Sequence, residues 1–244
     1  KEEDIKEKCE RVKSDPKFLA GFLCKDFNVK STVAESWLTF DQLNNEEKFN
    51  LESFKGSYFL GGADLSRTTD LTCATVMICG KKKRYVTQMY FLPEDTYYEY
   101  IKDKKIPYDK WKEQGLLRLC PGNQIDFSYV TQYFMEMVNK YELTPYGIFY
   151  DSWSSQYWQK EMESYGFQMY KVIQGMKTLS LPMQALGADL SAKKVVYQNN
   201  PLLKWCISNV NIKSDINGNI QPCKGTNPRM RIDGLASLLD SYVG

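Results

Sequence analysis

Three apolar segments joined by short polar turns limit the folds open to this 244-residue chain. The segments cover residues 58–65, 71–79 and 84–92, with polar turns at 66–70 and 80–83. Turns this short connect antiparallel strands, so the segments predict a β-meander. All three are apolar on both faces, and we therefore expect them near the centre of a sheet that is covered on both sides.

Helical and extended patterns alternate after the meander. Apolar spacing predicts a helix over 127–141 behind a cap at Asp126, a strand over 146–150, a helix over 152–165 and a strand over 168–173. Further predicted elements are helices over 181–188 and 201–207, a hairpin around 217–219 and a last helix from about 231. This order predicts an α/β fold: a mixed sheet, antiparallel in its three-strand meander and continued by parallel strands, with helices on both faces.

The first 55 residues differ in character from the rest. Acidic and basic residues alternate over 1–13, a short apolar helical stripe follows Pro16, and 44–54 is polar. We interpret 1–55 as a helical linker or appendage and 56–244 as the main domain.

The chain contains no histidine, which excludes Ser-His-Asp triads, Cys-His pairs, HExxH zinc helices and Cys₂His₂ fingers. Its seven cysteines include no CxxC pair, a pattern that favours buried thiols in a reducing cytoplasm. No apolar run is long enough for a membrane span, and a net charge of +2 argues against a chain-wide nucleic-acid polycation. Any catalysis must therefore use carboxylates, lysines, hydroxyls, thiols or a metal bound through oxygen.

Two aspartates stand at the carboxyl ends of predicted strands, where open α/β sheets bind ligands. Asp64 ends the first strand of the meander, and Asp151 ends the strand that follows the first long helix. A turn cap and a helix N-cap are the structural explanations for these positions. Two carboxylates 4 Å apart repel by about 4 kcal/mol at an effective dielectric of 20, so a functional cluster requires cations.

A third aspartate, Asp233, lies in the first turn of the last helix, where the helix dipole alone would favour it. Ala236, Ser237 and Asp240 share its helix face, and we expect the small residues to let that face lie close against the sheet edge. Ligands that are all oxygen favour Mg²⁺ or Mn²⁺ over zinc. Periodicity alone leaves open whether the three aspartates converge.

Short motifs surround these aspartates in a fixed order. They are Gly-Ala-Asp-Leu-Ser at 62–66, Thr-Asp-Leu-Thr at 69–72, Tyr-Asp-Ser-Trp at 150–153 and Arg-Ile-Asp-Gly-Leu-Ala at 231–236. Gln174-Gly175, Leu179-Ser180, Asn200-Pro201, Trp205 and Asn209 occur between them. Over about 56–244 the ordered set resembles the nuclease domain of terminase large subunits from tailed bacteriophages.

The resemblance implies an RNase H-like fold and a two-metal DNA endonuclease that cuts concatemeric viral DNA during genome packaging. It carries the catalytic and metal-ligand roles over to Asp64, Asp151 and Asp233, which would hold two Mg²⁺ or Mn²⁺ ions, and a secondary metal role to Asp70. The implied partners are double-stranded DNA, the terminase small subunit, the portal and a packaging ATPase, in the cytoplasm of the bacterial host. No GxxxxGK[ST] motif occurs, so we expect a C-terminal half whose residues 1–55 lead from the missing ATPase domain.

Basic residues in or beside predicted turns are candidates for DNA contact, because cationic side chains position a phosphate backbone without reading its sequence. The candidates are Arg67, Lys81, Lys82, Lys83, Arg84, Arg229 and Arg231. The last two rank highest because they directly precede Asp233. Solvated surface is the alternative explanation for each.

Three other functions stay open from the sequence. One is a different RNase H-like nuclease, such as a junction resolvase or a transposase, which a preference for four-way junctions would reveal. A second is an actin-like phosphotransferase, which would need a nucleotide. The third is a non-catalytic docking module for the portal or small subunit, whose carboxylates would be structural and would bind no metal.

Overall fold

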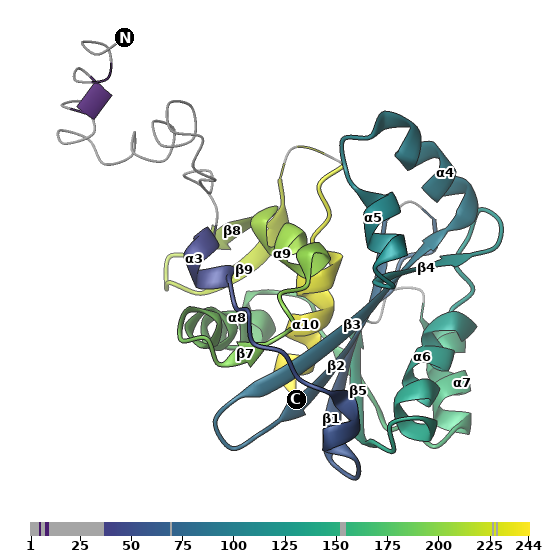
Figure 1. Ribbon diagram of the computed structural model, residues 1–244. Helices are drawn as coiled ribbons and strands as arrows, with labels where there is room; N and C mark the ends of the chain where they lie inside the picture. The colour runs from purple at the N-terminus through teal and green to yellow at the C-terminus, as the bar shows by residue number, and fades with distance from the viewer. Residues whose placement is uncertain are drawn as a thin grey trace.

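The computed structural model describes residues 5, 8–9, 37–68, 70–151, 155–225, 227 and 229–244 (Figure 1). The helical segments predicted before residue 37 lie almost wholly outside this range. Within it, no helix combines the length and apolar character needed to cross a lipid bilayer.

A mixed sheet forms the centre of the fold. Its strand order is β4-β3-β2-β1-β5-β6, and β7 pairs with β3. The strands are β1 (Tyr58–Asp64), β2 (Thr72–Cys79), β3 (Arg84–Pro93), β4 (Leu117–Cys120), β5 (Thr144–Asp151), β6 (Met169–Val172) and β7 (Val195–Val196). The first three are antiparallel neighbours, and β4, β5, β6 and β7 each join by parallel pairing. The predicted meander with parallel continuation is therefore confirmed.

Helices cover both faces of this sheet (Figure 1). They are α3 (Phe40–Leu43), α4 (Glu94–Asp103), α5 (Tyr108–Glu113), α6 (Ser128–Asn139), α7 (Gln156–Ser164), α8 (Met176–Ser191), α9 (Pro201–Ser208) and α10 (Asp233–Val243), with a 3₁₀ turn, η2 (Leu51–Phe54). Core residues of α6 and α7 pack with Phe59 and Val76 on one face, whereas α8, α9 and α10 pack with Met77 and Val86 on the other. Alternate residues of each central strand thus face opposite layers.

The start of α6 and the extent of α8 differ from their predictions. The N-cap residue of α6 is Phe127, one residue after the predicted cap, although Asp126 Oδ1 still accepts a hydrogen bond from the Ser128 amide at 2.9 Å. Helix α8 is much longer than predicted and contains Pro182 in its interior. Burial of Leu179, Met183, Leu186 and Leu190 along one side explains why the helix continues through a residue that lacks an amide donor.

The last helix lies directly on the face of the sheet. Ser237 Oγ donates to the Gly62 carbonyl oxygen at 3.0 Å and lies 2.7 Å from Thr75 Oγ1. A Cβ atom at Gly62 would stand 1.9 Å from the Ser237 carbonyl oxygen, so a side chain there would force the helix away. The small-residue face of α10 therefore allows close approach as predicted, but to the middle of the sheet and not to its edge.

The described residues before β1 are packed onto the same core. Leu38 and Leu43 are buried with Met183 and Leu186 of α8. The Asn45 side-chain amide donates to the Val195 carbonyl oxygen at 2.8 Å. A domain boundary near residue 55 stays a prediction, while residues 38–45 contribute to the folded core.

Candidate active site

A cavity of about 430 Å³ opens where β1 and β5 end. In their parallel pairing Ala63 is in register with Tyr150, so Asp64 and Asp151 leave the sheet side by side. The cavity is lined by Asp64, Leu65, Ser66, Arg67, Asp70, Asp151, Gln174, Lys224, Ile232, Asp233, Ala236 and Asp240. The aspartates singled out from the sequence are therefore brought to one place, together with Asp240.

A buried polar chain fixes the start of α10, and with it Asp233. The Gln88 side-chain amide donates to the Gly234 carbonyl oxygen and to Thr75 Oγ1, both at 2.8 Å. Tyr90 donates in turn to Gln88 Oε1 at 2.7 Å. These bonds tie the first turn of the helix to β2 and β3, which holds Asp233 beside the end of β1.

The cavity concentrates negative charge. Burial raises the pKa of Asp64 well above its usual value, and the charges of Asp233 and Asp151 raise it further. Burial likewise raises the pKa of Asp233 to about 6. Asp233 is only 3% exposed, and no described residue donates a hydrogen bond to its Oδ2. Buried carboxylates with so few donors are stabilised by an added cation.

Two basic side chains already compensate part of this charge. The Lys224 ammonium lies 2.5 Å from Asp70 Oδ2, and Arg231 forms an ion pair with the other oxygen of Asp70. Arg231 also donates to the Tyr100 hydroxyl at 3.0 Å. Lys224 comes from β9 (Ile220–Lys224), which pairs with β8 (Val210–Ser214) in a separate hairpin. Both oxygens of Asp70 are thus engaged by protein cations.

The donor chemistry fits a hard divalent cation, although the side chains are not preassembled around one. Among the described residues, no three acidic or thiol groups already stand in a metal-binding arrangement. Carboxylate oxygens are nevertheless the ligands that Mg²⁺ and Mn²⁺ prefer, and Asp233 Oδ2 is buried without a donor from any described residue. A bound ion would compete with the Lys224 ammonium, whose charge lowers the pKa of Asp64 and of Asp233.

The basic candidates for DNA contact fall into different regions. Arg67 lies exposed on the cavity wall, with its guanidinium 5.6 Å from the centre of the Phe127 ring. Residues 81–84 instead form the tip of the β2–β3 hairpin. Since Asp64 pairs with Cys73 and Phe59 pairs with Ile78, this tip lies at the opposite end of β2 from the carboxylates. The tip therefore does not border the carboxylate cavity, because an antiparallel strand carries its far turn away from the site.

Lys83 and Arg84 in that tip also have acidic partners, Glu47 and Asp189. Their ion pairs tie the tip to the segment before β1 and to α8. Lys81 and Lys82 are exposed, so they are the members of the tip best suited to contact a phosphate backbone.

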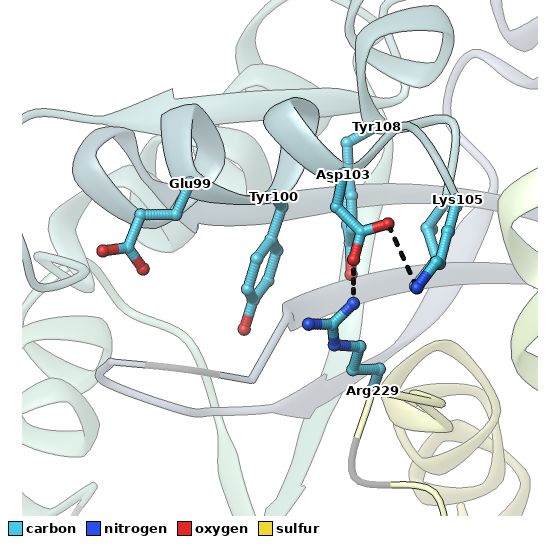
Figure 2. Close-up of a pocket in the computed structure, with 7 residues that line it drawn as sticks. Glu99, Tyr100, Asp103, Lys105, Tyr108 and Arg229 are labelled. Atoms are coloured by element: carbon cyan, nitrogen blue, oxygen red, sulfur yellow. Dashed lines mark hydrogen bonds and ion pairs between the residues drawn. The ribbon is translucent and has the colours of Figure 1, made fainter.

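Arg229 borders a second, smaller cavity of about 180 Å³ beside α4. Figure 2 shows Asp103 between Arg229, with which it forms an ion pair, and Lys105, whose ammonium lies 3.9 Å away. Tyr100 and Tyr108 also line this cavity, with their ring centres 5.3 Å apart. Arg231 donates a hydrogen bond to Tyr100, which lines the smaller cavity, and forms an ion pair with Asp70, which lines the larger one. Arg231 therefore lies between the two cavities.

Three residues that line the larger cavity were not identified as functional from the sequence: Gln174, Lys224 and Asp240. Gln174 follows β6, and its side-chain amide donates to Asp240 Oδ1 at 3.3 Å. Gln174 and Asp240 occur in the motif and the helix face described above, but spacing gives no measure of depth. Lys224 ends a short hairpin strand, and nothing in its local pattern indicates that it reaches another layer.

Comparison with known proteins gives consistent matches. A family model described as the endonuclease domain of the terminase large subunit matches residues 1–243. The terminase large subunit of Enterobacteria phage HK97 is 29% identical over 184 residues, which cover 72% of this chain and 35% of that protein. Protein YmfN of Escherichia coli K12 is 25% identical over 249 residues, covering 94% and 53% respectively. The chain thus spans from about a third to about half of the length of these relatives.

Two solved structures share the fold. The crystal structure of the HK97 large terminase gives a TM-score of 0.70 at 22% identity, covering all of this chain and 50% of that one. The large terminase nuclease of thermophilic phage G20c gives 0.51 at 12% identity, covering 77% and 84%. These likenesses confirm the predicted RNase H-like architecture.

Proposed function

The chain belongs to the family of terminase large-subunit endonuclease domains, and from this membership and its carboxylate cavity we propose that it hydrolyses DNA phosphodiester bonds with divalent cations. The observation that carries the proposal is that Asp64, Asp151 and Asp233 line one cavity. In this cavity burial and the neighbouring carboxylates raise the pKa of Asp64, and no described residue donates a hydrogen bond to Asp233 Oδ2.

Asp64, Asp151 and Asp233 would hold two Mg²⁺ or Mn²⁺ ions. When bound, such a pair of ions stabilises the attacking and leaving oxygens of an in-line phosphodiester displacement. Asp64 would share this role with both other aspartates, because its carboxylate interacts electrostatically with Asp233 and with Asp151.

The basic side chains would bind the DNA backbone. Lys224 pairs with Asp70, and its ammonium would be available for a phosphate oxygen when cations balance the carboxylates. Arg67 offers a second cation on the wall of the same cavity. Asp70 would serve chiefly to hold Lys224 and Arg231, and would become a metal ligand only by exchanging those partners.

The same membership supports a role in packaging. We infer that the whole protein cuts concatemeric viral double-stranded DNA in the cytoplasm of a bacterial host. Its expected partners are a terminase small subunit, a portal and a packaging ATPase domain. These proposals concern the longer protein, since this chain corresponds to about half or less of its relatives.

Substitution of the cavity carboxylates tests the proposal. Asp64→Asn and Asp151→Asn are expected to abolish nicking of supercoiled plasmid in Mg²⁺ or Mn²⁺ and to weaken Mn²⁺ binding in calorimetry, while circular dichroism stays unchanged. Asp109→Asn, an exposed carboxylate on α5, is the matched control. Unaltered Mn²⁺ affinity in both cavity variants would contradict the metal assignment, and a strong preference for four-way junctions would favour a resolvase.

A further inference from the structure

A fourth carboxylate, Asp240, lies in the wall of the same cavity. It follows Asp233 by seven residues on α10, which is two helical turns, so it lines the cavity from farther along the helix. Its side chain is 1% exposed. A buried acidic group is costly unless it is paired, hydrogen-bonded or bound to a cation, and its surroundings therefore show which of these applies.

The surroundings of Asp240 provide one donor and no counter-charge in the described part of the chain. Oδ1 accepts from the Gln174 side-chain amide at 3.3 Å, and no described residue donates to Oδ2. Burial raises the pKa of Asp240 well above its usual value, and the neighbouring charges that raise it further belong to Asp64 and Asp151. The charged groups that act on the Asp240 carboxyl are therefore also negative.

The protein cations act on other carboxylates of the cavity. Lys224 and Arg231 pair with Asp70, and both lower the pKa of Asp233 against the effect of burial. Neither Lys224 nor Arg231 lowers the pKa of Asp240 in this way. The protein cations thus compensate Asp70, Asp233 and, through Lys224, Asp64, whereas no described cation compensates Asp240.

We propose that Asp240 is a further ligand for the divalent cation held by Asp64 and Asp151, and that Gln174 positions it by donating to Oδ1. This assignment rests on the proposed function, because it adds a carboxylate to the same metal site. Oδ2 is the oxygen directed to the cation, since Oδ1 already accepts the amide hydrogen bond. An oxygen-rich shell of this kind suits Mg²⁺ or Mn²⁺.

A purely structural role makes a different prediction. If Asp240 only accepted the hydrogen bond from Gln174, an asparagine would keep that bond through its own carbonyl oxygen, and cation binding would not change. If Asp240 binds a cation, asparagine removes the charge that attracts it. The metal-free protein would then gain stability, because a buried acidic group that has no counter-charge among the described residues has been removed.

Calorimetric titration of the full chain with Mn²⁺ separates these cases. Asp240→Asn is expected to weaken Mn²⁺ affinity by about 10-fold or more, and Gln174→Met by about 10-fold through loss of positioning. The melting temperature of metal-free Asp240→Asn should rise, and its increase on adding Mn²⁺ should shrink. Asp109→Asn again serves as the control and should match the wild type in both measurements.

The outcomes distinguish this inference from the proposed function. Wild-type Mn²⁺ affinity in Asp240→Asn, combined with loss of binding in Asp64→Asn, would overturn the role of Asp240 and leave the nuclease proposal intact. Unchanged Mn²⁺ binding in Asp64→Asn and Asp151→Asn would contradict both the role of Asp240 and the proposed metal-dependent function. Should Asp240→Asn fail to fold, Gln174→Met carries the test, and wild-type affinity in that variant would overturn the positioning of Asp240.

Discussion

At the scale of single residues, Lys224 sets the charge balance of the carboxylate cavity. Burial raises the pKa of both Asp64 and Asp233, and the Lys224 ammonium opposes this rise while it contacts Asp70. An entering divalent cation must therefore compete with a charge that the protein supplies itself. The same charge becomes useful once DNA phosphate is present, so Lys224 affects cation binding and DNA binding in opposite directions.

Lys224→Met is expected to tighten Mn²⁺ binding by about threefold, because removal of a half-exposed competing charge is worth about 0.7 kcal/mol. DNA affinity should fall in the same variant. Calorimetry with Mn²⁺ and a DNA-binding titration measure the two effects. Lys213→Met removes an exposed lysine from the partner strand of the same hairpin and is the matched control. Equal Mn²⁺ affinity in the two variants would contradict the competition between Lys224 and the cation.

A residue of the site could be predicted from the sequence when the residues next to it in the chain already indicate its position in the fold. Asp64 and Asp151 end apolar strands, and parallel pairing brings the ends of such strands together. Asp233 could be identified by its motif, but its convergence with Asp64 depends on the close packing of α10. The contact of Lys224 with Asp70 joins residues 154 positions apart, and no local pattern encodes such a pair.

At the scale of secondary-structure elements, the contact between α10 and β1 fixes the distance between the carboxylates they carry. Gly62→Ala would bring a methyl group to within 1.9 Å of the Ser237 carbonyl oxygen. We expect a loss of about 1–3 kcal/mol in the free energy of unfolding, and reduced nicking because Asp233 moves away from Asp64. Urea denaturation gives the first quantity. Gly225→Ala, whose methyl group would stand 3.5 Å from the Asn211 side chain in ordinary van der Waals contact, is the control, and equal stability of the two variants would contradict this explanation.

The β8–β9 hairpin that carries Lys224 should loosen in acid. Asp215 accepts a hydrogen bond from the Asn219 side chain at 2.8 Å and from the Asn217 and Asn219 amides at 2.9 Å. The Asn219 side-chain bond, first among these, lowers the pKa of Asp215. A lowered pKa stabilises the folded turn above the unfolded pKa, and this contribution is lost as pH falls through the folded pKa. Amide exchange at Asn217 and Asn219, corrected for intrinsic rates, should accelerate as the pH falls below the usual pKa of an aspartate.

Asp215→Asn should remove that acid dependence, because asparagine does not titrate. A turn whose corrected exchange rates in the wild type stay constant over the same range would show that Asp215 does not stabilise the hairpin by its charge.

The three long strands of the meander were predictable, whereas two short strands were not predicted. Strands β1, β2 and β3 have seven to ten residues each and match their predicted segments closely. Strand β6 has only four residues but lies within its predicted segment, 168–173. Strands β4 and β7, with four and two residues, were not predicted, and they form by backbone pairing with β3. Helix α8 is likewise determined by tertiary packing, because its buried residues stabilise the helix on both sides of Pro182.

At the scale of the whole molecule, the sheet separates two groups of basic residues. Arg67 lies at the cavity, whereas Lys81 and Lys82 lie at the far turn of β2. Eight strand residues separate that turn from the carboxylate end, which corresponds to about 26 Å. If both groups contact DNA, they contact stretches of the duplex about eight base pairs apart.

Duplexes of different length therefore distinguish the two groups. A duplex of about 12 base pairs centred on the cavity extends about 20 Å to either side and does not reach the hairpin tip, whereas one of about 40 base pairs does. Lys81→Ala/Lys82→Ala should leave affinity for the short duplex unchanged. For the long duplex it should lower affinity and reduce the slope of log affinity against log salt by about two, because two phosphate contacts are lost. Arg67→Ala should weaken binding to both lengths. Equal salt slopes for the double variant and the wild type on the long duplex would show that the tip does not bind DNA, and DNA contact would then be confined to the cavity end of the molecule.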